Sequence, residues 1–381
     1  VVSILVTGCQ TPVRLMPTPV AFSAGDVDPF GGAEAKVART DVPVLYATNR
    51  AALVEWPEPI FTALPSAQVR VGIAHVRIGD DPLDWESLHR LSTSDDVEQR
   101  PIVRFDWLES KGALPVAGSP RAKDQAHTFF RLVDHALALS PGREIVVYVH
   151  GAASPVPRAV AQAAQFQHFA TRRVVVVSFM WPSVGSILRY LTDVGHAAAS
   201  VEPFAQLLQE LAAHTSASSI SVLSYSAGAK IVGPALAKLA GSGGGSPAAI
   251  RDKLRLRNIY YAAPDADTRL FVDQIREYVD VVGRVTVAVN RRDSALRVSQ
   301  LVHRASRAGR PDADELDPDQ RFFLIDASRQ LLVDLVEVDP DAIPGLARRS
   351  HAFWYEHPWV SSDVIALLLF DAAPAQRGLE E

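Results

Sequence analysis

Residues 220–228 read Ile-Ser-Val-Leu-Ser-Tyr-Ser-Ala-Gly, and this stretch decides the fold. It begins with an apolar run typical of a strand buried on both faces, and residues 229–240, which follow it, have the pattern of a helix. A tight turn between a strand and a helix forces one side chain outward above a sheet, and its neighbours must be small because the two backbones nearly touch. The central serine, Ser226, has Ser224 before it and an Ala-Gly pair after it. We therefore predict that Ser226 is a nucleophile, on a motif that differs from G-x-S-x-G by one residue.

Short apolar runs alternate with longer amphipathic ones from residue 42 onward, which is the pattern of an α/β fold with a mostly parallel sheet. The runs expected as strands are residues 42–46, 69–76, 102–107, 144–149, 173–179, 220–223, 256–262 and 285–289, with a late strand pair at 321–325 and 331–336. The segments expected as helices are residues 123–138, 156–170, 195–213, 229–240, 268–278 and 360–370. Because 48% of the 381 residues are hydrophobic, the chain can bury a large core, and we expect a single catalytic domain over residues 42–375.

The loop after residues 144–149 reads His150-Gly151-Ala152. A serine that attacks a carbonyl generates an oxyanion, which needs preorganised donors about 3 Å away. Beside a serine turn of this kind, one donor is the amide after the nucleophile and the other is an amide from such a loop. We therefore expect the amides of Ala227 and Ala152 to form the oxyanion hole. Gly151 would give backbone access, and His150 would be a packing residue.

Three histidines follow Ser226 in the chain, and one of them is the expected base. The partners of such a serine follow it in the order acid, then histidine. His351 comes after the last expected strands and before the closing helix, where the base belongs. His357, which precedes a proline, is the alternative base, and His303 is expected to be an ordinary residue.

The acid has three candidates, each at the end of an expected strand. Asp293 follows the strand at 285–289, which is the commonest location for the acid, and we favour it. Asp265 and Asp267 follow the preceding strand and stay as alternatives, because some lipases take their acid from that position. An aspartate between a strand and a helix most often caps the helix, so each of the three could have that role instead.

Further motifs accompany the serine turn. They are Tyr-Ala-Thr-Asn-Arg at 46–50, Val-His-Gly at 149–151, Phe-Met-Trp-Pro-Ser at 179–183 followed by Tyr190 and Asp193, Ala-Ala-Pro-Asp at 262–265, Arg-Arg-Asp-Ser-Ala-Leu at 291–296 and Ser-His at 350–351. Over about residues 42–370, the chain resembles a bacterial branch of the α/β-hydrolases known only as a domain of unknown function, numbered 900. The resemblance implies the α/β-hydrolase fold, with a mostly parallel central sheet and helices on both faces, and esterase or lipase-like activity. At the turn that carries the nucleophile, the family usually has His-Ser-Met-Gly, where this chain has Tyr225-Ser226-Ala227-Gly228.

The chain opens with the apolar run Val-Val-Ser-Ile-Leu-Val-Thr-Gly, which ends in small residues before the single cysteine, Cys9. This resembles the end of a bacterial lipoprotein signal peptide, with residues 6–9 as the lipobox and Cys9 as the lipid attachment site; the alternative is a short buried strand that ends at a core cysteine. No initiator Met or charged segment precedes the run, so we expect a truncated start or an unusual start codon. Residues 10–41 are rich in Pro, Gly and Ala and are expected as a flexible tether. We therefore expect a lipid-anchored protein of a bacterial cell envelope, which would be soluble where the anchor is absent.

Composition argues against several classes of function. The formal net charge is −5 and no basic cluster stands out, so no nucleic-acid partner is expected. One cysteine cannot form a disulfide within the chain. The sequence has no His-Glu-x-x-His segment, no Cys/His cluster and no phosphate-binding loop, so neither a metal nor another cofactor is expected. No later apolar stretch reaches the roughly 18 residues that a membrane span needs.

These features predict a serine hydrolase that cleaves small-molecule or lipid-like carboxylic esters. His351 would take the proton of Ser226, and Asp293 would orient the imidazole and stabilise its charged form. The alternatives are a thioesterase, an amidase or a polyester depolymerase with the same triad, and a non-catalytic hydrolase-fold lipoprotein that binds an envelope partner.

Overall fold

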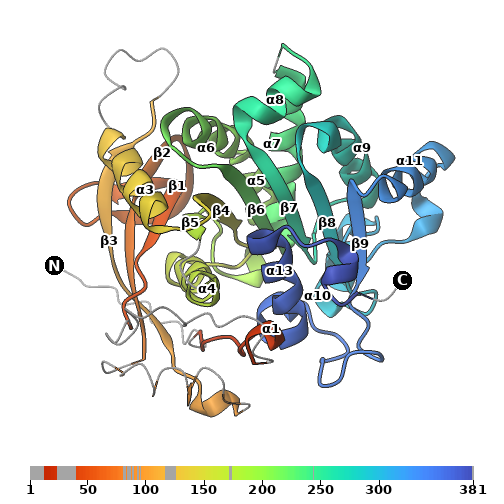
Figure 1. The fold of residues 1–381 in the computed structure, drawn as a ribbon, viewed down its shortest axis with the longest axis horizontal. Helices are drawn as coiled ribbons and strands as arrows, with labels where there is room; N and C mark the ends of the chain where they lie inside the picture. Colours follow the sequence, from red (N-terminus) through yellow and green to blue (C-terminus); the bar gives the residue numbers. More distant parts are fainter. Residues whose placement is uncertain are drawn as a thin grey trace.

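A nine-stranded sheet forms the centre of the protein (Figure 1). The computed structural model describes residues 13–23, 40–79, 96–115, 126–170, 174–242 and 244–379, with positions 83, 87, 90, 91 and 94. The strands are β1 (Val44–Val54), β2 (Ile60–Ile78), β3 (Val103–Ala113), β4 (Glu144–Val149), β5 (Val174–Phe179), β6 (Ser219–Tyr225), β7 (Leu256–Ala262), β8 (Arg284–Val289) and β9 (Val333–Glu337). They lie in the order β3-β2-β1-β5-β4-β6-β7-β8-β9.

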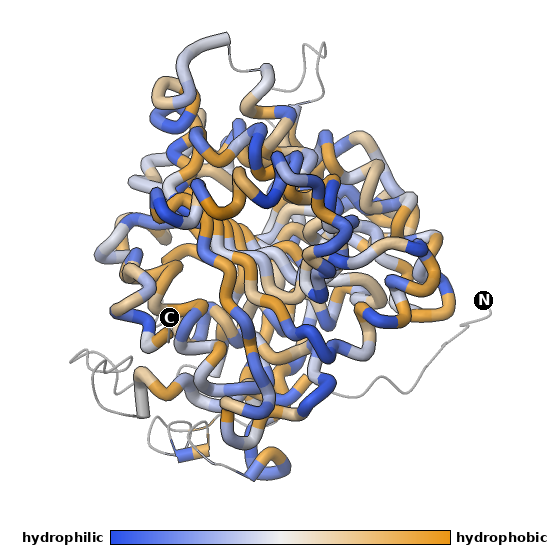
Figure 2. The backbone as a smooth tube through the Cα atoms, turned by 90° about the vertical axis from the view of Figure 1, so that its right-hand side faces the viewer, coloured by the Kyte–Doolittle hydropathy of each residue, from blue (hydrophilic) through white to orange (hydrophobic). Residues whose placement is uncertain are grey.

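The sheet is mostly parallel, as predicted. In the order of the sheet, every pair of neighbouring strands from β1 through β5, β4, β6, β7 and β8 to β9 is parallel. Strand β2 alone runs antiparallel to its two neighbours, β1 and β3. Strand β4 shows how the sequence specifies this arrangement. Ile145 and Val147 belong to the core on one face, and Val146 and Tyr148 to the core on the other. A continuous apolar run suits such a strand because both of its faces are buried. Figure 2 shows hydrophobic segments side by side in the centre of the molecule.

Helices cover both faces of the sheet (Figure 1). One face packs against α3 (His127–Leu139), α6 (Val201–His214), α7 (Ala229–Ser242), α8 (Pro247–Leu254) and α9 (Thr268–Tyr278). The other packs against α4 (Val156–Phe169), α12 (Phe353–Glu356) and α13 (Pro358–Phe370). The remaining helices are α1 (Val20–Ser23), α5 (Tyr190–Ala198), α10 (Ser294–His303) and α11 (Pro318–Arg329). This layered arrangement is the predicted α/β-hydrolase fold.

The carboxyl ends of the parallel strands meet at one edge of the sheet. In register, Val149 at the end of β4 lies opposite Phe179 of β5 and Ser224 of β6. The loops that follow β4, β6, β7 and β8 carry the predicted oxyanion loop, the serine turn and the candidate acids. Open α/β sheets bind their ligands at this edge, so the fold gathers the candidate residues where a site is expected.

Two predicted elements were wrong. Residues 321–325 lie within α11 and are not a strand: Asp317 accepts a hydrogen bond from Gln320 N, and Pro318 occupies the first turn. The run Arg-Phe-Phe-Leu-Ile favours a strand by composition, but this capping box starts a helix on which Phe322 stays 71% exposed. The helix expected at 195–213 is divided into α5 and α6, which separate at Ser200.

Part of the predicted tether is packed against the domain. Within residues 10–41, Leu15 and Met16 are buried, and Met16 N donates to Gln165 Oε1 on α4 at 3.1 Å. The short helix α1 contacts α13. Cys9 and the proposed lipobox lie outside the described residues. Among the helices that the structure describes, none is long and apolar enough to cross a membrane.

Candidate active site

Ser226 lies in the turn between β6 and α7, and its backbone is in the left-handed region, with φ 50°. A non-glycine residue is uncommon there, and such strain persists only where the surrounding structure imposes it. The turn lies close to the end of β4, since a Cβ at Gly228 would lie 2.7 Å from the Val149 carbonyl oxygen. The turn therefore requires a glycine at 228 and holds Ser226, 7% exposed, at the carboxyl edge of the sheet.

Ser226, His351 and Asp293 form one hydrogen-bonded chain. His351 Nε2 lies 2.8 Å from Ser226 Oγ, and His351 Nδ1 lies 2.6 Å from Asp293 Oδ2. A carboxylate can only accept, so Nδ1 carries the proton and Nε2 is free to accept the proton of the serine. Asp293 is fully buried, whereas the His351 side chain is 20% exposed. This arrangement can remove a proton from the serine and return it to a leaving group.

Two loops hold the His351–Asp293 pair in place. Asp293 also caps α10, because its second oxygen, Oδ1, accepts from Leu296 N at 2.9 Å. Asn290, in the same loop, donates from Nδ2 to the Ser350 carbonyl oxygen at 2.9 Å, next to the histidine. Sequence analysis did not single out Asn290, although a polar residue directly after a buried strand was the available signal.

The chain matches the model of one protein family over residues 125–351, which is more than half of its length. The family is described as alpha/beta hydrolase of unknown function (DUF900). The chain belongs to this family. Membership confirms the resemblance and indicates a hydrolase, and the matched region contains Ser226, Asp293 and His351. No curated protein and no solved structure matches the chain.

In this DUF900 hydrolase, the alternative acid Asp265 belongs to a different network. Its Oδ1 accepts from Ser299 Oγ at 2.7 Å and from Arg307 Nε at 2.8 Å, and its Oδ2 accepts from the Tyr190 hydroxyl. Burial alone would raise the pKa of Asp265, but the charges of Lys230 and Arg307 hold it well below its usual range. Both carboxylate oxygens are thus bound to partners other than the candidate base.

The other residues predicted as alternative acid or base, and His303, lie at the ends of helices. Asp267 caps α9, where its Oδ1 accepts from Leu270 N at 3.1 Å. His357 caps α13 in the same way, because its Nδ1 accepts from Trp359 N at 3.3 Å. His303, at the end of α10, lies beside Asp265's network rather than beside Ser226: its Nε2 contacts the tyrosine hydroxyl of that network at 3.2 Å.

The loop after β4 lies against the serine turn. A Cβ at Gly151 would be 3.0 Å from Ser226 Cβ, so a glycine at this position lets the loop approach the serine turn closely. His150 is stacked on Trp181, with 5.1 Å between the ring centroids. Burial lowers the pKa of His150 to about 3, so the ring is neutral and packs in the core of the loop.

Tyr225, which directly precedes Ser226, packs beside the candidate base. Its ring centroid is 5.3 Å from that of His351 and 5.7 Å from that of Tyr355. Trp354 closes the same cluster at 6.2 Å from Tyr225. Sequence analysis had assigned no role to these aromatic residues, which form one wall beside the imidazole.

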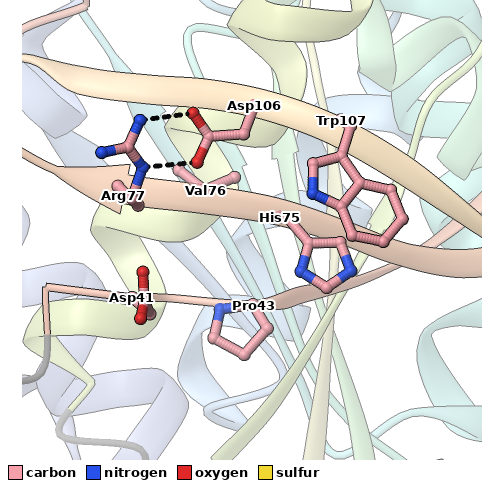
Figure 3. Close-up of a pocket in the computed structure, with 7 residues that line it drawn as sticks. All are labelled: Asp41, Pro43, His75, Val76, Arg77, Asp106 and Trp107. Atoms are coloured by element: carbon pink, nitrogen blue, oxygen red, sulfur yellow. Dashed lines mark hydrogen bonds and ion pairs between the residues drawn. The ribbon is translucent and has the colours of Figure 1, made fainter.

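Two cavities of the described residues are large enough for a small ligand. One of about 320 Å³ lies on the β2–β3 side of the sheet, where Arg77 is paired with Asp106 and His75 is stacked on Trp107 (Figure 3). None of the candidate catalytic residues lines it.

The other cavity, of about 360 Å³, lies between α5, α7, α9 and α10, and none of Ser226, Asp293 and His351 lines it either. Its lining is Val194, Lys230, Pro234, Ala266, Asp267, Leu270, Phe271, Gln274, His303 and Arg307. Lys230 lies one helical turn after Ser226, and the amide of Asp265 donates to the Ser226 carbonyl oxygen at 3.0 Å. Within the described residues, no group of three or more His, Cys, Asp or Glu side chains could hold a metal ion.

Proposed function

We propose that the protein is a serine hydrolase that cleaves carboxylic esters. As Ser226 Oγ attacks the ester carbonyl carbon, its proton passes to His351 Nε2, and the carbonyl oxygen becomes an oxyanion. The bond to the alkoxy group then breaks, and that group leaves with the proton from His351. Water, deprotonated by the same imidazole, attacks the acyl-enzyme and releases the carboxylic acid and Ser226.

The observation that carries the proposal is the continuous chain from Ser226 Oγ to His351 and on to the buried Asp293, with separations of 2.8 and 2.6 Å. A purely structural serine gains nothing from the left-handed backbone at φ 50°, whereas this conformation turns the side chain of a nucleophile outward at the edge of the sheet. Asp293 would keep the Nδ1–H tautomer and stabilise the imidazolium that forms during attack.

We assign the oxyanion hole to the backbone amides of Ala227 and Ala152. Ala227 directly follows the nucleophile at the start of a helical turn, and Ala152 follows the glycine that touches Ser226. Backbone donors of this kind need no reorganisation during the reaction, which makes them effective at stabilising developing charge.

A fluorophosphonate probe and p-nitrophenyl esters of increasing acyl length test the proposal. Wild type should be labelled and should hydrolyse the esters, and Ser226→Ala should do neither. Ser224→Ala is the matched control: this neighbouring hydroxyl is buried and has no hydrogen-bond partner among the described residues, so its loss should change neither property. Equal labelling of wild type and Ser226→Ala would refute the nucleophile. Turnover of matched thioesters or anilides with no turnover of esters would refute the ester substrate.

A further inference from the structure

Asp193 is a buried carboxylate that joins two loops at the carboxyl edge. Its Oδ2 accepts from Ala153 N at 3.0 Å and from Ser183 Oγ at 2.7 Å, and its Oδ1 accepts from Val184 N at 2.7 Å. Ala153 belongs to the loop after β4, and the other two donors belong to the loop after β5. Asp193 stands in the Tyr190–Asp193 motif, for which the sequence offered no role, and it contacts neither Ser226 nor His351.

Arg50 binds the same two loops. It lies on the part of β1 that extends past Ala47, the residue paired with the last residue of β5. Its Nη2 donates to the carbonyl oxygens of Ser154 and Ser183 at 3.1 and 3.0 Å. Burial lowers the pKa of Arg50 to about 10 and the charge of Asp193 opposes that shift, so the buried guanidinium stays charged at neutral pH.

The loop that these two residues hold is strained. Ala153 has φ 52°, a left-handed conformation that an alanine adopts only when its surroundings impose it. The hydrogen bond from Ala153 N to Asp193 is one such constraint. Ser154 adds two more, since its amide donates to Ser183 Oγ at 3.0 Å and its hydroxyl donates to the Ala152 carbonyl oxygen at 3.2 Å. Hydrogen bonds therefore hold the peptide groups on both sides of Ala152. On one side the Gly151 carbonyl oxygen contacts His150 Nδ1 at 2.8 Å, and on the other the Ala152 carbonyl oxygen and Ala153 N have the partners just described.

We propose that Asp193 and Arg50 are positioning residues that aim the Ala152 amide at the oxyanion. The proposal rests on the proposed function, because it needs an acyl transfer at Ser226. It gives a role to the Tyr-Ala-Thr-Asn-Arg and Tyr190–Asp193 motifs, which lie about 140 residues apart and meet only in the folded chain. An amide donor that strengthens only as the oxyanion forms acts on the transition state and hardly at all on the bound ester.

Asp193→Asn is the first test. Asparagine has the size of aspartate, but one of the two carboxylate oxygens is replaced by an NH₂ group. This NH₂ group would face a backbone N–H of Ala153 or Val184 and could not accept its hydrogen bond, so the loop would lose its fixed geometry. We expect kcat for a p-nitrophenyl ester to fall about 100-fold or more, as for the loss of one oxyanion donor, with KM within threefold of wild type. Affinity for an alkyl boronic acid, which forms a tetrahedral adduct on the serine, should fall in proportion to kcat/KM. The midpoint of the pH–rate profile should stay unchanged, because the variant leaves the His351–Asp293 contact intact.

Two further variants keep the test decisive if Asp193→Asn folds poorly. Ser183→Ala removes only the hydroxyl that links Asp193 Oδ2 to Ser154 N, and it should give a smaller loss of the same kind. Asp363→Asn is the matched control: it removes a buried carboxylate that binds Arg377 at 2.7 and 2.9 Å, on α13 and away from the turn. It should lose thermal stability and keep kcat per folded molecule.

Unchanged boronate affinity in Asp193→Asn, or a loss of kcat no larger than that of Asp363→Asn at equal loss of melting temperature, would overturn the positioning role. Failure of the proposed function would appear differently, as wild-type protein that neither hydrolyses the ester nor binds the boronate at Ser226.

Discussion

Replacing Asp293 by asparagine should remove nearly all turnover and leave the folded protein about as stable as wild type. The two oxygens of this carboxylate have separate partners. Oδ2 accepts from His351 Nδ1 at 2.6 Å, and Oδ1 accepts from Leu296 N at 2.9 Å as the cap of α10. Asparagine retains one carbonyl oxygen, which can stay on the cap, and presents an NH₂ group to the imidazole.

The expected magnitudes follow from these two contacts. Asparagine and aspartate are about equally good helix caps, so the change at Leu296 should alter the free energy of unfolding by less than about 1 kcal/mol. An NH₂ group facing His351 favours the tautomer in which Nε2 carries the proton, and such an imidazole cannot accept the proton of Ser226. In a Ser-His-Asp triad this change costs about 10⁴ in kcat, or about 5.4 kcal/mol of activation free energy.

The assay compares kcat for a p-nitrophenyl ester with urea-induced unfolding of the same preparations. Asp267→Asn is the matched control, because Asp267 caps α9 through Leu270 N and does not contact the histidine. It should leave both kcat and stability near wild type. Asp265→Asn should lose about 3–5 kcal/mol of stability, since it leaves the buried Arg307 without its carboxylate, and its kcat should fall less than tenfold.

Two results would refute this reasoning. Asp293→Asn with kcat within tenfold of wild type would reduce Asp293 to a helix cap. Asp265→Asn with a collapsed kcat and unchanged unfolding would move the acid to the loop after β7.

Three further predictions concern acid stability, the serine turn and the N-terminus. Burial lowers the pKa of His150 to about 3, whereas in the unfolded chain this histidine takes up a proton near pH 6.5. The stability that the neutral ring contributes is therefore complete above pH 6.5 and is lost as the pH falls toward 3. The free energy of unfolding should fall by up to about 1.4 kcal/mol per pH unit over this range. His150→Phe should therefore flatten the decline in unfolding free energy between pH 6.5 and 4, and an equal slope in both proteins would contradict the buried neutral ring. Gly228→Ala should destabilise the fold by about 1–3 kcal/mol in a thermal melt, because its Cβ would meet the Val149 carbonyl oxygen at 2.7 Å; an unchanged melting temperature would show that the turn can relax. The lipid anchor stays a prediction: Cys9→Ala should move the protein from the membrane to the soluble fraction of bacterial cells, and equal membrane association of both forms would rule it out.

The central strands and the serine turn could be predicted because their causes are local. Strands β4 and β7 have the bounds expected from their apolar runs, since a strand buried on both faces must be apolar throughout. The turn at Ser226 needs small neighbours, which the sequence displays directly. Helix α11 was missed because composition outweighed its capping signal, although Asp317 and Gln320 stand three residues apart at its start.

Contacts between distant segments could not be read in the same way. Arg50 and Ser183 are 133 residues apart, and Asn290 reaches Ser350 across 60 residues. Such side chains show their role only when the strand order brings their loops to one edge of the sheet. The packing of Leu15 and Met16 was hidden for the same reason, because their proline-rich surroundings resemble those of a tether.

The choice of acid shows why sequence reasoning leaves alternatives even where its preference has geometric support. A cap and a triad acid had been treated as competing roles for each aspartate, but a carboxylate has two oxygens and can serve both. Asp293 caps α10 with one oxygen and contacts His351 with the other. The capping hydrogen bond fixes the carboxylate at the start of α10. The hydrogen bond from Asn290 to the Ser350 carbonyl oxygen fixes the loop of the histidine beside it. The capping contact therefore contributes to the geometry that the proposed reaction needs.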